Sequence, residues 1–491
     1  MSSPDSPLLP VLSPIAISEM TTRSGKVFND GKADINMNSP GKNGRAEKSD
    51  RIFYIVFASL VLDLLAFTVI LPLLPGLLDH YSQNDSSGLY NVLKNSVSGF
   101  RSLVGAPDNA RWNSVLFGGV IGSLFSLLQF LTSPIIGAAS DVYGRRPLMI
   151  LCMIGIATSY LIWAVSNSFL TFVIARIVGG ISKGNVSLST AIVTDVSSPQ
   201  KRGKGMALIG VAFSIGFVFG PSIGAGISIL TKADDAAVAY MIPALFSLTL
   251  ALADLIFIYV FLEETLPTNK RLQSKNVLSH AIEYINPVSL FKFSSVKKLS
   301  ATESSKVQSL GAIYFIYLFI YSGLEFTLPF LMHDRFSYTS VQQGRMFFFL
   351  GFVMALVQGG YTRRISPGKE SKIASHGILI LMPSFVMMAY ASSTWFMYLA
   401  LTLFSFASAT VVPCLTTLVS TYGGDNEKGT IMGIFRSLGA LARAFGPFWA
   451  SAVYWSFGPN ACYIQGALIL LLPMYQIYKQ VKAETKRSTF M

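Results

Sequence analysis

The sequence predicts an all-α membrane protein whose twelve transmembrane helices form two six-helix pseudo-repeats. Three observations support this prediction: the composition, the number of long apolar segments and a similarity between the two halves. Of the 491 residues, 52% are hydrophobic and only 13% are charged, whereas a soluble protein carries about 25% charged residues. Most of the chain is therefore expected to lie in lipid.

A helix needs about 20 apolar residues to cross a bilayer, and the chain holds twelve segments of that kind. They are 52–78, 112–138, 147–166, 168–193, 203–230, 238–262, 309–332, 341–362, 373–391, 394–420, 429–457 and 459–479. Only a few residues separate the third segment from the fourth and the ninth from the tenth, so each pair is expected to form a tight hairpin. The longest polar insertion, 263–308, divides the segments into six and six.

The two halves resemble each other when residues 202–221 are shifted by 226 positions onto 428–447. The shift aligns Arg202 with Lys428, Gly203 with Gly429, Met206 with Met432, Gly220 with Gly446 and Pro221 with Pro447. This overlays the fifth segment on the eleventh, as a six-helix repeat requires.

The distribution of Lys and Arg predicts the orientation in the membrane. With a cytoplasmic N-terminus, 28 of them fall on or near the cytoplasmic side and six on the opposite side, while Arg176, Lys183, Arg436 and Arg443 lie well inside apolar segments. Cytoplasmic loops carry the excess of positive charge, so we expect both termini to be cytoplasmic. The net charge of +13 is interpreted as this bias, and no nucleic-acid partner is expected.

The same orientation places the loop 79–111 outside the cytoplasm. It carries Asn84-Asp85-Ser86, a glycosylation acceptor pattern, so we predict Asn84 as a glycosylation site. The expected location is the plasma membrane, with an intracellular membrane as the alternative.

Five regions are predicted along the chain. They are a disordered cytoplasmic tail (1–50), an N-terminal six-helix bundle (51–262), a cytoplasmic linker with a short interfacial helix (263–308), a C-terminal six-helix bundle (309–480) and a second tail (481–491). The first tail is rich in Ser, Asn, Gly, Lys and Asp and lacks enough apolar side chains to fold.

The sequence gives no sign of an enzyme. The three cysteines lie in apolar segments and the four histidines are scattered, so neither a disulfide framework nor a metal site is expected. No phosphate-binding loop and no nucleophile–base–acid set is found. No cofactor is expected, and transport driven by ATP is excluded.

One charged cluster stands between two apolar segments. Residues 137–146 read Gly-Ala-Ala-Ser-Asp-Val-Tyr-Gly-Arg-Arg and predict a tight cytoplasmic hairpin that forms a conformational gate. Its candidate residues are Gly137, Asp141, Gly144, Arg145 and Arg146. Asp141 is expected to face the start of the segment 429–457, because a helix N-terminus carries about half a positive charge. The alternative is that the two arginines are ordinary positive-inside anchors.

Ionisable side chains inside membrane helices are costly, by about 2.5–3.5 kcal/mol each on insertion scales, and mark a pathway by default. Six candidates for a substrate or proton pathway are Asp63, Arg176, Lys183, Glu325, Arg436 and Arg443. Four are positive, which favours an anion. The alternative is a set of structural ion pairs, Asp63 with Arg176 and Glu325 with Arg443.

Several further residues have two interpretations. Asp63 or Glu325 is a candidate for the proton-coupling group. Gln129, Asn185 and Gln358 either contact substrate or join neighbouring helices. The pairs Gly220-Pro221 and Gly446-Pro447 are interpreted as helix bends with close helix contacts.

The stretch 137–146 resembles the signature loop of the major facilitator superfamily, Gly-x-x-x-Asp-x-x-Gly-Arg-Arg/Lys. Arg176–Gly180 resembles that superfamily's helix 4 motif, and Gly210–Gly224 its helix 5 antiporter motif. Leu62–Gly76 is similar to helix 1 of the tetracycline–proton antiporters. The stretches Arg176–Val193, Ser322–Glu325, Gln343–Phe348 and Arg436–Arg443 look like a single member of the superfamily.

This resemblance implies the major facilitator fold, alternating access and a carrier of organic anions, amphipathic drugs included. We therefore expect a secondary active transporter, proton-linked or working by exchange, that is a monomer with small organic anions, the bilayer and protons as partners. The alternatives are a proton antiporter for cationic drugs or tetracyclines, and a membrane receptor or scaffold that transports nothing.

Overall fold

The computed structural model describes residues 42–104, 110–197, 199–230, 236–271, 285–294, 296, 299–366, 368–422 and 428–489. The chain divides into two compact units, Met1–Ala46 and Glu47–Met491. Most of the tail predicted over 1–50 lies outside the described residues. Helix α1 (Lys42–Thr68) begins inside that stretch, so residues 42–50 are helical.

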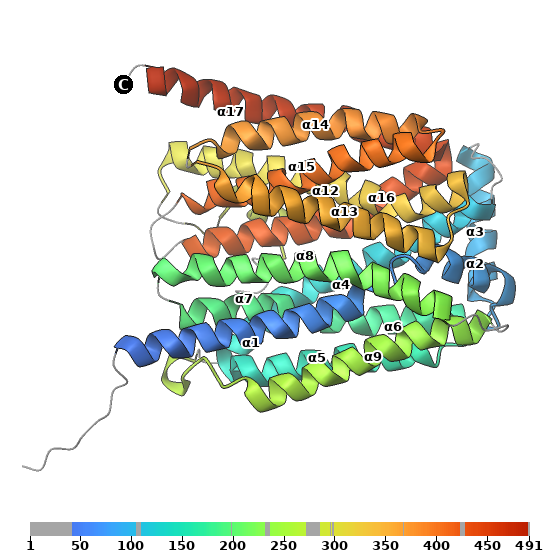
Figure 1. The fold of residues 1–491 in the computed structure, drawn as a ribbon, viewed down its shortest axis with the longest axis horizontal. Helices are drawn as coiled ribbons and strands as arrows, with labels where there is room; N and C mark the ends of the chain where they lie inside the picture. Colours follow the sequence, from blue (N-terminus) through green and yellow to red (C-terminus); the bar gives the residue numbers. More distant parts are fainter. Residues whose placement is uncertain are drawn as a thin grey trace, which may run out of the picture. The chain divides into compact units, whose positions relative to one another are not determined.

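All regular elements in the described residues are helices (Figure 1). Those up to residue 261 are α1, α2 (Leu74–Asn84), α3 (Leu89–Val104), α4 (Ala110–Tyr143), α5 (Arg145–Ala164), α6 (Phe169–Ser182), α7 (Asn185–Val196), α8 (Pro199–Leu230) and α9 (Ala236–Phe261). Those after it are η1 (Thr268–Lys270), α11 (Pro287–Lys292), α12 (Ala301–Phe336), α13 (Ser340–Gly360), η3 (Thr362–Arg364), α14 (Glu370–Tyr390), α15 (Thr394–Ser420), α16 (Lys428–Ile469) and α17 (Leu471–Thr489).

Eleven segments of the described chain are long and apolar enough to cross a membrane. The last of them, Ile431–Lys482, contains two of the predicted segments. These two join at Gly458, whose φ of 84° departs from helical geometry within α16, and Pro459 follows it. The structure therefore agrees with the twelve predicted crossings.

Two predicted segments are broken, and one predicted loop contains a helix. The segment 52–78 is interrupted between Thr68 and Leu74, next to Pro72, and becomes α1 and α2. The segment 168–193 is interrupted at Lys183 and Gly184 and becomes α6 and α7. The loop 79–111 contains α3. In the linker, α11 lies where the short helix was predicted, and the Asn286 side chain accepts from the Val288 amide at its start.

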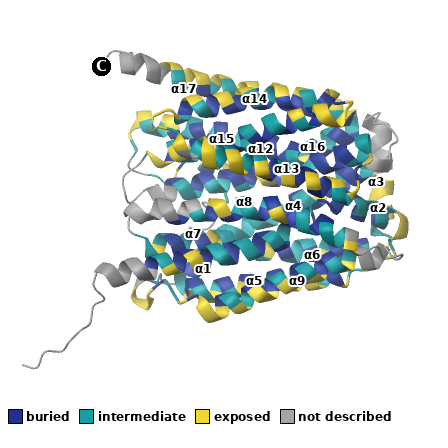
Figure 2. Ribbon diagram, viewed as in Figure 1, coloured by how far each residue is buried: buried dark blue, intermediate teal, exposed yellow. Residues whose placement is uncertain are grey.

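Large apolar side chains cover the outside of the bundle formed by Glu47–Met491. Figure 2 shows exposed residues along the outer faces of α5 and α9, which include Leu151, Leu161, Ile256 and Tyr259. An outward apolar surface of this kind is expected for helices that face lipid.

The two halves meet along two helix pairs. Helix α4 contacts α16, and α8 contacts α13. Within each half, a Gly-Pro pair allows two long helices to pack closely. A Cβ at Gly220 of α8 would overlap Thr68 of α1, and a Cβ at Gly446 of α16 would overlap Phe319 of α12. The two Gly-Pro pairs thus occupy equivalent packing positions, and each glycine allows a close contact that a side chain would prevent.

Candidate functional site

Two ends of the bundle are distinguished below. The Asp79 end is the one at which α2 ends and α4 begins, with Asp79, Trp112 and His333. The Arg145 end is the one at which α4 ends and α5 begins, with Asp141, Arg145 and Asp195.

The N-terminal half holds a buried ion pair between Lys183 and Asp63. The distance between Lys183 Nζ and Asp63 Oδ1 is 2.6 Å, and the two side chains are only 5% and 1% exposed. Asn185 donates to the other carboxylate oxygen at 2.7 Å. The structural alternative from the sequence paired Asp63 with Arg176, and this partner is wrong.

The break between α6 and α7 explains the geometry of this pair. Lys183 ends α6 with φ −79° and ψ 45°, outside helical geometry, and Gln129 of α4 donates to its carbonyl at 3.4 Å. A Cβ at Gly184 would collide with Ile136, so glycine lets the broken segment lie against α4. The break carries the lysine to α1, which a continuous helix would not do.

Arg176 lies on α6 one to two turns before the break and contacts aromatic rings. Its guanidinium carbon lies 4.4 Å from the centroid of Phe125 and 5.9 Å from that of Phe67, and the two rings stack at 5.4 Å. Among the residues that the structure describes, no carboxylate lies within ion-pair distance of Arg176. Cation–π contact holds the guanidinium in place without neutralising its charge.

The C-terminal half holds a second group around Glu325. The Tyr321 hydroxyl lies 3.2 Å from Glu325 Oε1 and 2.8 Å from Ser408 Oγ. A phenol has one hydrogen, so the Tyr321 hydroxyl can donate it either to Ser408 or to the Glu325 carboxylate. Arg443 interacts electrostatically with Glu325.

Arg436 connects the two halves. Its guanidinium donates to the Thr190 hydroxyl on α7. Helix α7 begins directly after the break at Lys183 and Gly184. A second connection is the hydrogen bond from Ser214 to the Gln358 side chain at 3.1 Å. Gln358 and Asn185 thus make contacts within the protein, as the interhelical alternative predicts.

Arg145 is the centre of the charged network at the Arg145 end. Its side chain, 9% exposed, lies 2.6 Å from Asp141 and 2.8 Å from Asp195. Its backbone amide donates to Glu264 Oε1 at 3.0 Å, and Arg146 donates to the Tyr259 carbonyl at 2.7 Å. The network joins α4, α5, α7 and the segment after α9.

The glycines of the predicted gate differ in their surroundings. Gly144 has φ 104°, and a Cβ there would meet the Glu264 carboxylate, so both the backbone and the contact require glycine. A Cβ at Gly137 would meet nothing within 4 Å. Asp141 pairs within its own half, and the side chains of Lys428 and Gly429, where a partner was expected, lie outside those described.

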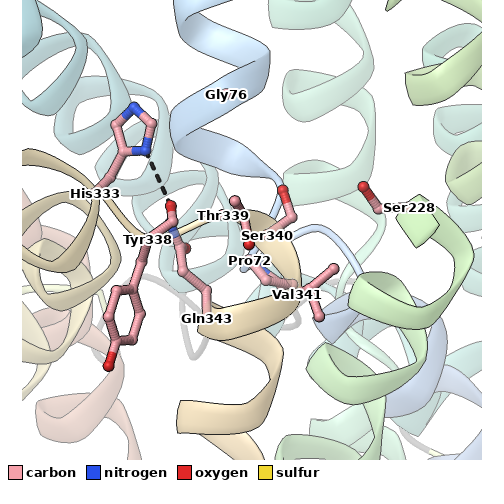
Figure 3. A pocket seen from close by; sticks show the side chains of 9 residues that line it. All are labelled: Pro72, Gly76, Ser228, His333, Tyr338, Thr339, Ser340, Val341 and Gln343. Atoms are coloured by element: carbon pink, nitrogen blue, oxygen red, sulfur yellow. Dashed lines mark hydrogen bonds between the residues drawn. The ribbon is translucent and has the colours of Figure 1, made fainter. Parts of the chain in front are cut away.

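A cavity of about 450 Å³ opens between the halves at the Asp79 end. Figure 3 shows its lining, in which the His333 ring is hydrogen-bonded to the backbone carbonyl of Tyr338 and the Tyr338 ring points away from His333. The lining residues are Pro72, Gly76, Ser228, His333, Tyr338, Thr339, Ser340, Val341 and Gln343. Two tryptophans also bond across the halves there: Trp112 to Asp334 at 3.1 Å and Trp455 to Asn113 at 3.0 Å.

Sequence reasoning did not identify Asp254, Asp79 or His333. Asp254 lies inside an apolar span and is 0% exposed. An acid within such a span is itself a signal and could have been found. Asp79 and His333 lie 254 positions apart, and only the meeting of the halves brings them together. The predicted acceptor Asn84 lies at an exposed position at the end of α2, where its side chain contacts His80.

Known proteins support the fold and extend the resemblance. The family model of the Major Facilitator Superfamily matches residues 56–447. Major facilitator superfamily domain-containing protein 10 of Mus musculus is 48% identical over 449 residues, which cover 90% of this chain and 96% of that protein. It is the single member that the sequence motifs resemble. The tetracycline resistance protein of class C from Escherichia coli is 23% identical over 83% of this chain and 90% of its own.

A solved structure agrees with these relatives. The crystal structure of the human organic anion transporter MFSD10 (TETRAN) is 47% identical, has a TM-score of 0.73, and is matched over 87% of this chain and 99% of its own. Sequence and structure therefore lead to the same conclusion: the chain belongs to the Major Facilitator Superfamily and is a multi-pass membrane transporter, not an enzyme.

Proposed function

We propose that this protein is a secondary active transporter that carries organic anions across a membrane by alternating access. The observation that carries the proposal is Arg176. It is a cation within a membrane helix, seated on Phe67 and Phe125, with no carboxylate in ion-pair distance among the described residues. Such a charge is best compensated by an anion that arrives with the substrate.

The surroundings of Arg176 suit an anion that also carries an aromatic or apolar group. The stacked rings of Phe67 and Phe125 offer an apolar surface beside the positive charge. Lys183 contributes less than its charge suggests, because Asp63 compensates it at 2.6 Å. The cations of the C-terminal half, Arg436 and Arg443, supply the opposite side of the proposed path.

Alternating access would use the two helix pairs at which the halves meet, α4 with α16 and α8 with α13. The hydrogen bonds of Trp112, Trp455 and His333 join the two halves at the Asp79 end, beside the cavity. We infer that opening this end breaks these bonds. The Arg145 network holds the helices of the N-terminal half together while the halves move.

The driving force would come from protons or from exchange. Glu325 lies within hydrogen-bond distance of the Tyr321 hydroxyl and near Arg443, so its charge would respond to an anion bound by that arginine. The orientation follows from the bias of 28 Lys and Arg against six, which places the Arg145 end and both termini in the cytoplasm. A surface location and a monomer remain part of this proposal.

Uptake of a labelled organic anion into proteoliposomes tests the proposal. Loss of one charge-assisted contact costs about 1.5–3 kcal/mol, so Arg176→Gln should raise the half-saturating concentration by about 10- to 100-fold. Arg176→Lys should recover part of that loss. Arg364→Gln removes an exposed arginine of η3 and should behave like the unsubstituted protein.

Two results would contradict the proposal. Uptake of cationic drugs in place of anions, driven by a proton gradient, would indicate the tetracycline-type alternative. Specific binding of the anion without any transport, under gradients and exchange conditions alike, would indicate a receptor or scaffold.

A further inference from the structure

Asp254 is a buried acid that the proposed path for the anion does not use. It lies on α9 within the span Tyr240–Phe261 and is 0% exposed. Ser59 of α1 is a polar neighbour, but neither carboxyl oxygen of Asp254 makes a hydrogen bond. An ionised carboxylate without a partner is among the costliest groups to bury.

The cation beside Asp254 already has another partner. Lys183 is the nearby cation, and it lies 2.6 Å from Asp63, whose second oxygen accepts from Asn185. From α5, the Cys152 thiol faces the same pair, and Tyr160 interacts with Asp63 and Arg176. Arg176 is not among the described groups that act directly on Asp254. Asp254 and the charged groups that do, Asp63 and Lys183, amount to two carboxyls and one ammonium, and one proton makes this set neutral.

We propose that Asp254 is a proton-binding site that carries a proton in this conformation. Among the residues that the structure describes, Lys183 is the cation that acts on both Asp63 and Asp254, so the carboxyl that lacks the lysine holds the proton. This inference rests on the proposed transport and deepens it, since it moves the proton site from Asp63 or Glu325 to a carboxyl on α9.

The position of Lys183 gives this site a link to the transport cycle. Lys183 stands at the break between α6 and α7, and α7 contacts the other half through Thr190 and Arg436. When the halves separate there, α7 and the break can shift, and Lys183 then exchanges Asp63 for Asp254. Asp254 then releases its proton to the open side, while Asp63, exposed to water there, stays ionised. When the halves close again, Lys183 returns to Asp63 and Asp254 takes up a new proton, so proton movement accompanies the change of conformation.

The substitution Asp254→Asn tests the proposal, because an amide has the shape of a protonated carboxyl and cannot release a proton. We expect the variant to bind the labelled organic anion within about two-fold of the unsubstituted protein and to keep exchange. Uptake driven by a pH gradient should fall at least ten-fold, and vesicles loaded with a pH-sensitive dye should report no proton flux. Asp254→Leu provides a second neutral variant, and Glu370→Gln, at the start of α14, is the control for loss of a carboxylate elsewhere.

Infrared spectroscopy of the purified protein tests the proton without transport. The carbonyl stretch of a buried protonated carboxyl should be present in the unsubstituted protein and absent from Asp254→Asn. Identical infrared spectra of the unsubstituted protein and Asp254→Asn would overturn the inference. It would also be overturned if both Asp254 variants retained uptake driven by a pH gradient. If the unsubstituted protein carries no anion at all, the proposed function fails, and the infrared comparison still decides whether Asp254 binds a proton.

Discussion

Asp79 and His333 join the two halves of the protein, with His333 Nε2 3.1 Å from Asp79 Oδ2. The other ring nitrogen lies 3.2 Å from the Tyr338 carbonyl. Ser114 donates to Asp79 Oδ1 at 2.7 Å. With an acceptor at each nitrogen, His333 must carry both hydrogens and a positive charge to make both bonds. Tyr90 and Tyr240 are described titratable groups that act on Asp79, and Asp334, next to His333 in the chain, accepts from Trp112.

This pair predicts that the Asp79 end opens more readily as the pH on its side rises. Histidine changes charge between about pH 5 and 8, and loss of the proton removes both the ion pair and one hydrogen bond. A cysteine in place of Ser228, which lines the cavity, should react faster with an impermeant maleimide at high pH. The three native cysteines are buried, so background labelling should be low.

The reaction of any cysteine with maleimide becomes faster as the pH rises. The labelling rate of the cysteine at position 228 is therefore divided by the labelling rate of a cysteine introduced at the exposed position Ser87. We expect this ratio to rise across the range in the unsubstituted background and to stay constant with His333→Gln. A constant ratio in the unsubstituted background would show that the pair does not control opening.

The ion pair of Asp63 and Lys183 predicts strong coupling between the two side chains. Removing one partner leaves a buried charge and costs about 3–5 kcal/mol, whereas replacing both is often nearly neutral. Lys183→Met alone should therefore destabilise the protein far more than Lys183→Met combined with Asp63→Asn. Unfolding in detergent, followed for all four members of the cycle, measures the coupling. Additive effects would mean that the two charges do not interact.

The sequence was sufficient to predict the membrane-spanning segments, but not the breaks within two of them, helix α3 or the partners of the charges. Long apolar runs and the aligned Gly-Pro pairs can be recognised locally in the sequence. In the structure the runs form long helices, and the two glycines lie at close helix contacts. The pairing of Lys183 with Asp63 depends on the break at Gly184, whereas the sequence, read as a continuous helix, suggested Arg176 as the partner of Asp63. No local sequence pattern shows which face of a helix packs against the other half of the protein.

The network at the Arg145 end shows the same limit. The cluster of Asp141 and Arg145 was visible in the sequence because charge is rare between apolar segments. Its further partners, Asp195 and Glu264, lie 50 and 119 positions away and depend on how α7 and the end of α9 fold back. Tertiary packing, not local sequence, decides these contacts.

Arg145 itself predicts a loss of stability on substitution. Arg145→Gln would leave Asp195 and Asp141 without their cation. Because Arg145 is buried, we expect the free energy of unfolding to fall by about 3 kcal/mol. This is the lower end of the range for broken buried ion pairs, since Asp141 is partly exposed. Thermal unfolding of the detergent-purified protein measures it. Arg146→Gln is the matched control, since that side chain bonds a single carbonyl. Equal effects of the two variants would contradict the central role of Arg145.

Asp85 predicts acid sensitivity in the turn between α2 and α3. Partial desolvation raises the pKa of Asp85, but hydrogen bonds from the amides of Tyr90, Ser87 and Phe169 and from the Ser87 hydroxyl outweigh it, so the pKa is lowered overall. A lowered pKa means that the stabilisation is complete above the unfolded value of about 3.9 and disappears as the pH falls through the folded value.

Hydrogen exchange of the Tyr90 and Phe169 amides measures this effect between about pH 5 and 3. Protection, relative to the intrinsic rate, should decline with acid in the unsubstituted protein. It should be low and independent of pH in Asp85→Asn, which loses the charge but keeps the shape. Equal protection in both proteins would show that the charge of Asp85 does not hold the turn.

Asn84 predicts a single N-linked glycan and tests the orientation of the whole chain. Its side chain is exposed at the end of α2, and the neighbouring Ser86 hydroxyl donates to the Asn167 carbonyl at 3.3 Å. Expression in cells with a secretory pathway should yield a protein whose electrophoretic mobility changes on treatment with a glycosidase. Asn84→Gln should abolish the change, while Asp85→Asn keeps the acceptor pattern and should preserve it.

Glycosylation requires that the α2–α3 turn lie on the lumenal side, and therefore that the Arg145 end and both termini face the cytoplasm. An acceptor introduced at the exposed Lys369, after η3, should remain unmodified in the same cells. Modification of that site instead of Asn84 would reverse the proposed orientation. It would also place His333 and its proton on the cytoplasmic side, so that cytoplasmic pH, not external pH, would control the Asp79 end.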